Sequence, residues 1–512
     1  MQSIIQTLKE RREYFKNEML EYYHFISRKV SVVGTNAKDI FHIIKNADGT
    51  VRIQINKTNA DSTVGDVIYD RLFSRNTTRE IRLFGMAGND KFIVEGGKSP
   101  IEIRIVGGAG NDEFINNGNG GKIRLYDVTF EDNKISGNPG LTNRFSKDPQ
   151  VNTYDRLNFK YDYVKPGLAL AYNKDDGLFA GPKLEIVTQG FKKDPYSTRH
   201  FIIAEHALKT KSYHFVLNSD YINVLGNYDI AVRSDVRAPD NETNFFGIGN
   251  NTIRNKNVAD VIHYYRANYN LINVSGYLRR QLQSWMRIYL GPSFQLIHAD
   301  STENNNHFIR TFASGIDQNN LYRIRTYAGF DARVEINSKN NDAIPTRGAT
   351  LDAGVRSLFG LNQYSSNVTQ LNTDLRIFMS LATKTNLVLA TRFGWGKNIG
   401  HYEFAQAQYL GGTDNLRGFR KQRFAGRSML YNNTELRIKV ADYNTYLFPG
   451  SFGFYIFNDV GRVFENEKSY SWHDGYGGGL WVAPIRRYVI TFSLAHSVEE
   501  NLLPRITFGF EF

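Results

Sequence analysis

The chain has 512 residues, no cysteine and a formal net charge of +12, and 41% of its residues are hydrophobic. The mean hydropathy of −0.43, together with the lack of an apolar run of about 20 residues, excludes a transmembrane helix. The lack of cysteine excludes disulfides and thiolate metal sites. No basic run with interleaved aromatic residues occurs, so we expect no nucleic-acid binding.

Residues 1–29 are predicted to form an amphipathic helix. Its apolar residues recur at spacings of three, four and seven, at Ile4, Leu8, Phe15, Met19, Tyr22 and Ile26. Two interpretations fit this pattern: a helix packed on its own domain, which we expect, and a connector from an upstream segment. The segment lacks the apolar core of a signal peptide, so we expect an exported form to be processed or truncated.

Residues 30–154 are predicted to form a β-rich domain, because short alternating runs are separated by Gly and Asn clusters. Residues 85–92 are echoed by residues 107–114, which places Asp90 and Asp112 22 residues apart. Both copies resemble the turns of calcium-binding β-rolls, in which Asp carboxylates bind Ca²⁺. Because such rolls repeat about every nine residues, we favour a metal-free pair of stacked turns, with Ca²⁺ at Asp90 and Asp112 as the alternative.

Residues 155–512 are predicted to form a 16-stranded antiparallel transmembrane β-barrel, so the fold class is an all-β membrane protein. Apolar and charged residues alternate, as where Leu436 and Ile438 oppose Glu435 and Arg437. An Arg or Lys facing lipid at the midplane costs roughly 2–4 kcal/mol, so the charged face indicates a hydrated interior. The first strand is expected near 166–173. Long connections at 239–259, 299–320 and 398–425 fall on one side, and the insert at 337–347 is long for the other side.

The end of the chain has the pattern of a closing barrel strand. Ile506, Phe508, Phe510 and Phe512 alternate with Arg505, Thr507, Gly509 and Glu511. We therefore expect the four apolar residues to face lipid, and we interpret Phe508, Phe510 and Phe512 as a C-terminal barrel signal.

The connection at 398–425 contains Leu410-Gly-Gly-Thr-Asp-Asn-Leu-Arg-Gly-Phe419, which follows the eleventh strand of our count. This motif resembles the lumen loop of the BamA/TamA superfamily of outer-membrane assembly and translocation barrels. Phe246–Asn250, Pro345–Gly348 and Asp459–Val463 resemble further family segments in the same order. The resemblance covers about residues 160–512.

The resemblance implies that Arg417, Gly418 and Phe419 form the tip of a loop folded into the lumen. Arg417 would pair with Asp459, because a guanidinium can bind a carboxylate through two hydrogen bonds. Gly418 would allow a tight tip, and Phe419 would pack on the barrel interior. It also implies an outer-membrane location, with the N-terminal domain in the periplasm.

The resemblance implies insertion, assembly or translocation of protein or lipid clients through a weak seam between the first and last strands. Pro166 and Gly167 in the first strand would limit pairing there. The expected partners are outer-membrane lipid, lipopolysaccharide and unfolded outer-membrane proteins.

Residues 1–150 depart from this family and resemble the linker region of metallophosphoesterase–barrel fusions. The alternative function is therefore a membrane anchor or export pore for a periplasmic catalytic domain. A third possibility is a soluble carbohydrate- or calcium-binding β-protein. Because no nucleophile, phosphate-loop or metal-cluster motif occurs, we expect no catalytic residues and no enzymatic activity.

Overall fold

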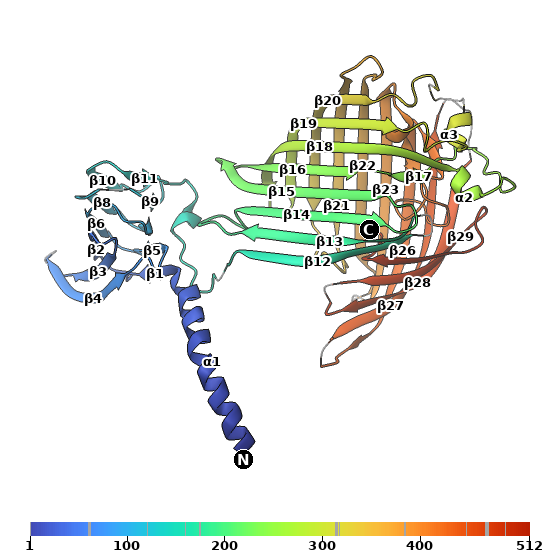
Figure 1. Cartoon of the computed structure of the whole chain (residues 1–512). Coiled ribbons are helices and arrows are strands. Elements are labelled where there is room, and N and C mark those ends of the chain that lie inside the picture. Colours follow the sequence, from blue (N-terminus) through green and yellow to red (C-terminus); the bar gives the residue numbers. More distant parts are fainter. Residues whose placement is uncertain are drawn as a thin grey trace. The chain divides into compact units, whose positions relative to one another are not determined.

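The computed structural model describes residues 2–512 except 60–62, 120, 159, 174–175, 313–315, 317, 383–385, 447, 466–470 and 487. The chain divides into two compact units, Met1–Phe159 and Lys160–Phe512 (Figure 1). In the described part of the chain, no helix is both long and apolar enough to cross a membrane.

The first unit begins with the predicted helix, α1 (Gln2–Ser27). The side chains of Ile4, Leu8 and Phe15 are 63%, 59% and 59% exposed. The expectation that this helix packs on its own domain is therefore wrong. The sheets that follow bury their apolar side chains against each other, and the apolar face of α1 stays in solvent.

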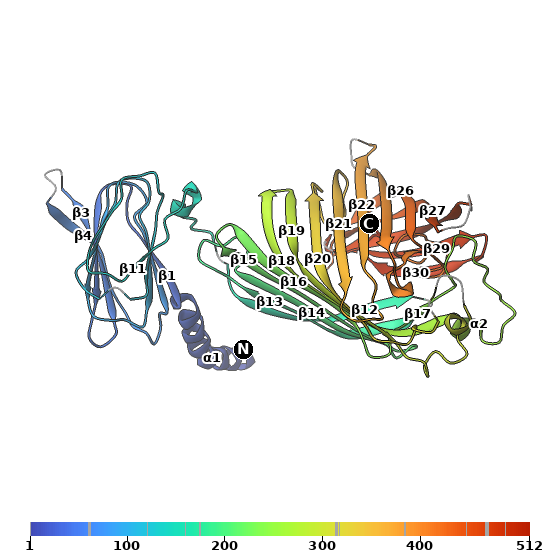
Figure 2. The same cartoon turned by 90° about the horizontal axis from the view of Figure 1, so that it is seen from above.

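Two sheets make up the rest of the first unit, with β1 and β11 on one side and β3 and β4 on the other (Figure 2). The first sheet is parallel, in the order β1 (Lys29–Val33), β5 (Glu80–Phe84), β7 (Glu102–Val106), β9 (Ile123–Tyr126) and β11 (Leu141–Asn143). The second has the order β10 (Lys134–Gly137), β8 (Glu113–Asn116), β6 (Lys91–Gly96), β2 (Asp39–Lys45), β3 (Val51–Thr58) and β4 (Val64–Phe73). The pairs β2–β3 and β3–β4 are antiparallel, and the other neighbours in the second sheet are parallel. A 3₁₀ helix, Pro149–Asn152, follows.

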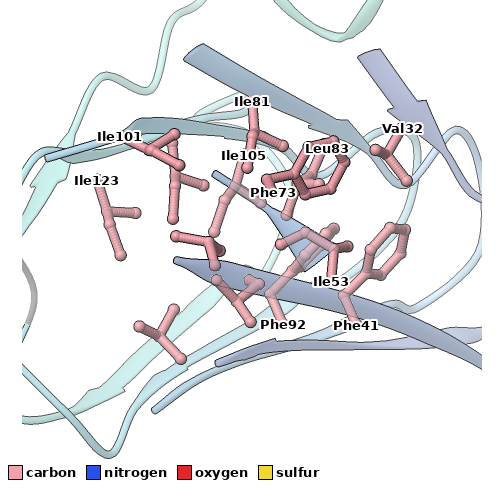
Figure 3. Packing of buried hydrophobic residues seen from close by; sticks show 14 of the residues in the cluster. Val32, Phe41, Ile53, Phe73, Ile81, Leu83, Phe92, Ile101, Ile105 and Ile123 are labelled. Atoms are coloured by element: carbon pink, nitrogen blue, oxygen red, sulfur yellow. The ribbon is translucent and has the colours of Figure 1, made fainter. Parts of the chain in front are cut away.

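This arrangement is a β-solenoid, in which each rung contributes one strand to each sheet. Glu80 pairs with Glu102 and Lys91 with Glu113, so one rung spans 22 residues. Apolar side chains stack in columns between the sheets, as in Figure 3; the rings of Phe41 and Phe92 lie 4.5 Å apart. The 22-residue spacing of the repeat is therefore the length of one complete rung. The repeated turns at 85–92 and 107–114 form one corner of it.

The described residues of the second unit form one antiparallel sheet of seventeen strands, of which β17 has only three residues, leaving sixteen long strands as predicted. The first eight long strands are β12 (Tyr163–Asn173), β13 (Gly177–Thr188), β14 (Thr198–Ala207), β15 (Tyr213–Leu225), β16 (Tyr228–Arg237), β18 (Arg266–Gln283), β19 (Met286–Ala299) and β20 (Arg325–Asn337). The last eight are β21 (Gly348–Gly360), β22 (Val368–Ser380), β23 (Leu387–Gly400), β26 (Ser428–Tyr443), β27 (Gly450–Phe464), β28 (His473–Pro484), β29 (Ile490–Ser497) and β30 (Leu503–Phe508). They curve into a barrel (Figure 1).

Long loops and short turns lie at opposite ends of the strands. Three loops carry short elements: β17 (Glu242–Asn244) and α2 (Val261–Tyr264) before β18, α3 (Phe308–Thr311) before β20, and a 3₁₀ helix (Phe404–Gln406), β24 (Gln408–Leu410) and β25 (Phe424–Gly426) before β26. These loops all lie at the same end, as predicted. The long connection between β20 and β21 lies at the turn end.

The strands alternate between an apolar outer face and a polar interior. Leu290, Phe330 and Leu480 are exposed on the outside, whereas Glu435 and Asp459 are buried. This separation is the one predicted from the charge pattern, because lipid would not solvate the charged face.

The last four residues do not follow this alternation. β30 ends at Phe508, and Gly509 has a φ of +103°, which turns the chain. Phe508 is exposed on the outer face, but the ring of Phe510 packs on Trp481, and Phe512 is buried with Phe378. The expectation that Phe510 and Phe512 face lipid is therefore wrong, because a positive φ interrupts the two-residue period.

The barrel has a seam between its first and last strands. The sheet order begins with β12 and ends with β30, and among the described residues no backbone ladder joins these two strands. They nevertheless approach each other, since Tyr172 of β12 and Pro504 of β30 line the same cavity. The barrel is closed in space but not by continuous hydrogen bonding.

Candidate functional site

The loop between β23 and β26 folds back into the barrel. Its two short strands β24 and β25 pair with each other, with Leu410 opposite Phe424. Leu410, Leu416 and Phe419 are buried in one cluster with Tyr431 and Val463, which belong to the barrel wall. The loop therefore has an apolar core that it shares with the inside of the barrel.

Arg417 fastens the tip of this loop to the wall. Its main-chain N and its Nε donate to Oδ2 of Asp459 at 2.9 and 2.7 Å, and its Nη2 donates to Oδ1 at 2.7 Å. Its Nη1 donates to Glu435, and its guanidinium lies 3.7 Å from the ring centre of Phe457. All three charged side chains are at most 2% exposed. A buried guanidinium with this many acceptors holds the loop in one geometry.

Gly418 and Phe419 complete the tip. Gly418 has a φ of +91°, and a Cβ there would lie 2.5 Å from the carbonyl oxygen of His496. The hydroxyl of Ser497 donates to the carbonyl oxygen of Gly418 at 2.6 Å. Phe419 is fully buried, with its ring against Phe424. Only glycine fits this position without strain, since the backbone of β29 lies so close.

The sequence matches the Omp85 superfamily domain over residues 140–512. This chain belongs to the Omp85 superfamily. The match confirms the resemblance inferred from the loop motif. No curated protein matches the sequence.

Several solved structures match this Omp85 chain. BamA from Haemophilus ducreyi lacking POTRA domains 1-3 matches with a TM-score of 0.50 and 13% identity, covering 68% of this chain and 70% of that chain. CdiB from Escherichia coli has a TM-score of 0.43 and 12% identity, covering 67% of this chain and 61% of that chain. CdiB from Acinetobacter baumannii has a TM-score of 0.42 and 13% identity, covering 68% of this chain and 59% of that chain. The Omp85 chain is thus an outer-membrane barrel with a periplasmic N-terminal region.

Sequence reasoning missed two members of the Omp85 loop site. Glu435 accepts from both Arg417 and Arg437, and Nη2 of Arg437 donates to the main-chain oxygen of Phe512 at 2.7 Å. A chain of charges thus connects the loop tip to the end of the sequence. The alternation had placed Glu435 and Arg437 on the inner face, but it carried no information on which inner residues meet.

The base of the loop is fastened separately. Arg423 donates from Nε and Nη2 to the two carboxylate oxygens of Glu499 at 2.6 and 2.7 Å. Lys421 lies 3.0 Å from Asp176, and Arg420 lies 3.1 Å from Glu500. These partners come from other loops at the same end, so the lumen loop is braced against its neighbours as well as the wall.

Asp90 and Asp112 lie outside the Omp85 match, at one corner of the solenoid. The main-chain N of Asp39 donates to Oδ1 of Asp90, and that of Asp90 donates to Oδ1 of Asp112, both at 2.8 Å. Oδ2 of Asp90, Asp112 and Asp127 is buried without a hydrogen-bond partner among the described residues. The described residues contain no group of three or more His, Cys, Asp or Glu side chains that could hold a metal ion. The carboxyls of Asp90 and Asp112 act as acceptors for main-chain N–H groups that come earlier in the chain.

Burial favours the protonated form of the three carboxyls in this column. Burial raises the pKa of Asp90 and that of Asp112 to about 8, and the pKa of Asp127 to about 6. A protonated carboxyl can be buried far more cheaply than a carboxylate.

The stability of the solenoid is therefore expected to fall as pH rises. The folded unit keeps protons that the unfolded chain releases above the ordinary Asp pKa, so its stability is greatest below that pKa and declines up to about pH 8. Hydrogen exchange of the full chain at about pH 5 and 8.5, corrected for intrinsic rates, should show falling protection in residues 85–146. Asp112→Asn should flatten this dependence, and Asp132→Asn, at an exposed position, should not. Equal pH dependence in both variants would contradict the assignment.

Proposed function

We propose that this Omp85 barrel inserts or translocates protein or lipid clients at the outer membrane, without enzymatic activity of its own. The observation that carries this proposal is the seam. β12 and β30 are neighbours in the barrel, yet among the described residues no backbone ladder joins them. An unpaired strand edge is a template for an incoming strand.

The lumen loop supports the same proposal. Arg417 holds the loop on β26 and β27, through Glu435 and Asp459. The loop tip also touches β29 and β30: the carbonyl oxygen of Gly418 accepts from Ser497, and Arg505 donates to the carbonyl oxygen of Phe419 at 3.4 Å. The loop therefore keeps the last strands in place while the seam is free to open. Unfolded outer-membrane proteins are the proposed clients, and outer-membrane lipid and lipopolysaccharide are the proposed surroundings.

Reconstitution tests this function. The full chain in liposomes of bacterial phospholipids should accelerate the insertion of a urea-denatured small barrel protein several-fold over protein-free liposomes. Protease protection of the inserted product measures the rate. A matched sample with the loop variant Arg417→Met separates a specific effect from a disturbance of the bilayer. Equal rates with and without the Omp85 protein would contradict the proposal.

A second candidate is an anchor or export pore for a periplasmic catalytic domain. The observation favouring it is that the N-terminal unit is a β-solenoid, whose parallel rungs resemble a rigid spacer. Depletion in cells distinguishes the two functions. Client insertion predicts a reduced amount of many outer-membrane proteins, whereas anchoring predicts the loss of one enzymatic activity with the other barrels unchanged.

A further inference from the structure

A second cavity, separate from the lumen loop, lies at the turn end of the barrel. It has a volume of about 170 Å³ and is lined by ends of strands and turns, among them Arg437, Lys439, Asp442, Trp481, Arg486 and Phe510. β12 begins at this end and is preceded by the periplasmic N-terminal region, so the cavity faces the periplasm.

Two buried donors on the wall of this cavity lack acceptors. Arg437 and Trp481 are 4% and 2% exposed. Nη1 of Arg437 and Nε1 of Trp481 have no hydrogen-bond partner among the described residues. A buried N–H without an acceptor destabilises the fold, so two such groups at one cavity favour the binding of an acceptor there.

The charges around the cavity favour an anion. Arg437, Lys439 and Arg486 carry three positive charges. Among the lining residues Asp442 opposes them, with its carboxylate 3.1 Å from Lys439 and 3.8 Å from Arg486. Glu435, behind the wall, divides its contacts between Arg437 and Arg417. The lining thus carries an excess of positive charge even though Arg437 is paired.

The remaining wall is aromatic. The ring of Phe510 lies 3.9 Å from the guanidinium carbon of Arg437 and 5.7 Å from the ring of Trp481. This packing fixes the plane of Arg437. A guanidinium held in one plane, with an N–H still available, is suited to an oxygen of a phosphate group.

We propose that this cavity binds a phosphate group, as free phosphate or as the headgroup of a phospholipid. Nη1 of Arg437 and Nε1 of Trp481 donate to its oxygens, and Lys439 and Arg486 at the rim attract its charge. Phe510 supplies an apolar wall for the group that carries the phosphate. The site goes beyond the proposed function and does not depend on it.

Calorimetric titration of the full chain in neutral detergent tests this site, with inorganic phosphate in one arm and dihexanoyl phosphatidylglycerol in the other. Binding in either arm is expected, and the stronger arm identifies the source of the phosphate. The double variant Lys439→Gln/Arg486→Gln should weaken binding about tenfold or more. Trp481→Phe keeps an aromatic side chain and removes the indole N–H donor, so it should weaken binding several-fold.

The matched control removes two basic residues from the same end of the barrel, away from the cavity. Arg280→Gln/Arg287→Gln alters exposed positions next to the turn between β18 and β19 and should leave binding unchanged. Equal losses in both double variants would overturn the proposal, since they would indicate general attraction to a basic surface. Absence of binding in both arms at millimolar concentration would also overturn it, because water would then satisfy the two donors.

Discussion

Replacement of Arg417 with methionine is expected to destabilise the barrel by about 3–5 kcal/mol, the usual cost of removing one partner from a buried ion pair. Asp459 would lose the two hydrogen bonds from the guanidinium and keep the one from the main-chain N of residue 417, and Glu435 would keep only Arg437. Both carboxylates would stay buried with too little compensating charge. Equilibrium unfolding by urea in detergent micelles, followed by tryptophan fluorescence, measures the change.

Two further variants make this result specific. Arg427→Met removes an arginine from the same loop whose side chain is 37% exposed, and it should cost about 1 kcal/mol or less. Arg417→Met combined with Asp459→Asn should recover part of the lost stability, because the buried charge is removed together with its partner. If Arg417→Met costs no more than Arg427→Met, the loop is not held by its arginine.

Covalent closure of the seam is expected to abolish client insertion. The chain has no cysteine, so Tyr172→Cys/Pro504→Cys creates a single reactive pair. Both positions line a cavity of about 140 Å³, within reach of a short reducible thiol cross-linker. With β12 tied to β30, an incoming strand cannot reach either edge. Insertion into liposomes should stop on cross-linking and resume on reduction.

The control for this experiment joins two strands that are already paired. Ile202 of β14 lies opposite Leu217 of β15 in the ladder. Cross-linking Ile202→Cys/Leu217→Cys should leave insertion unchanged, since those strands have no need to part. If both cross-linked pairs retain full activity, clients do not pass through the seam.

The sequence was sufficient to predict the barrel because alternation is a strong local signal. Leu436 is apolar and Glu435 is charged. Only the orientation of their strand that turns Glu435 toward the interior keeps the charge out of the lipid. The same reasoning predicted the number of long strands and the end at which the long loops lie. Arg417 and Asp459 were placed together by resemblance to a family, and the structure gives that pair its geometry.

Other features depend on information that no local pattern carries. The solenoid arises from parallel pairing between residues 22 apart, such as Lys91 and Glu113, and turn motifs report only one corner of each rung. Gly509 reverses the faces of Phe510 and Phe512 through a single positive φ. The partners of Glu435 depend on how a long loop returns into the barrel, which is decided by tertiary packing.

The rungs of the N-terminal unit have a consequence for its evolution. Each rung binds the next through the same backbone ladder and a side-chain oxygen at the same corner, which Asp112 supplies to Asp90 and Asn133 supplies to Asp112. Duplication of one 22-residue segment would therefore lengthen the unit by one strand spacing, about 4.8 Å, and create no new kind of contact. Gene duplication within this segment would change the length of the N-terminal unit in equal steps, without any change to the sequence of the barrel.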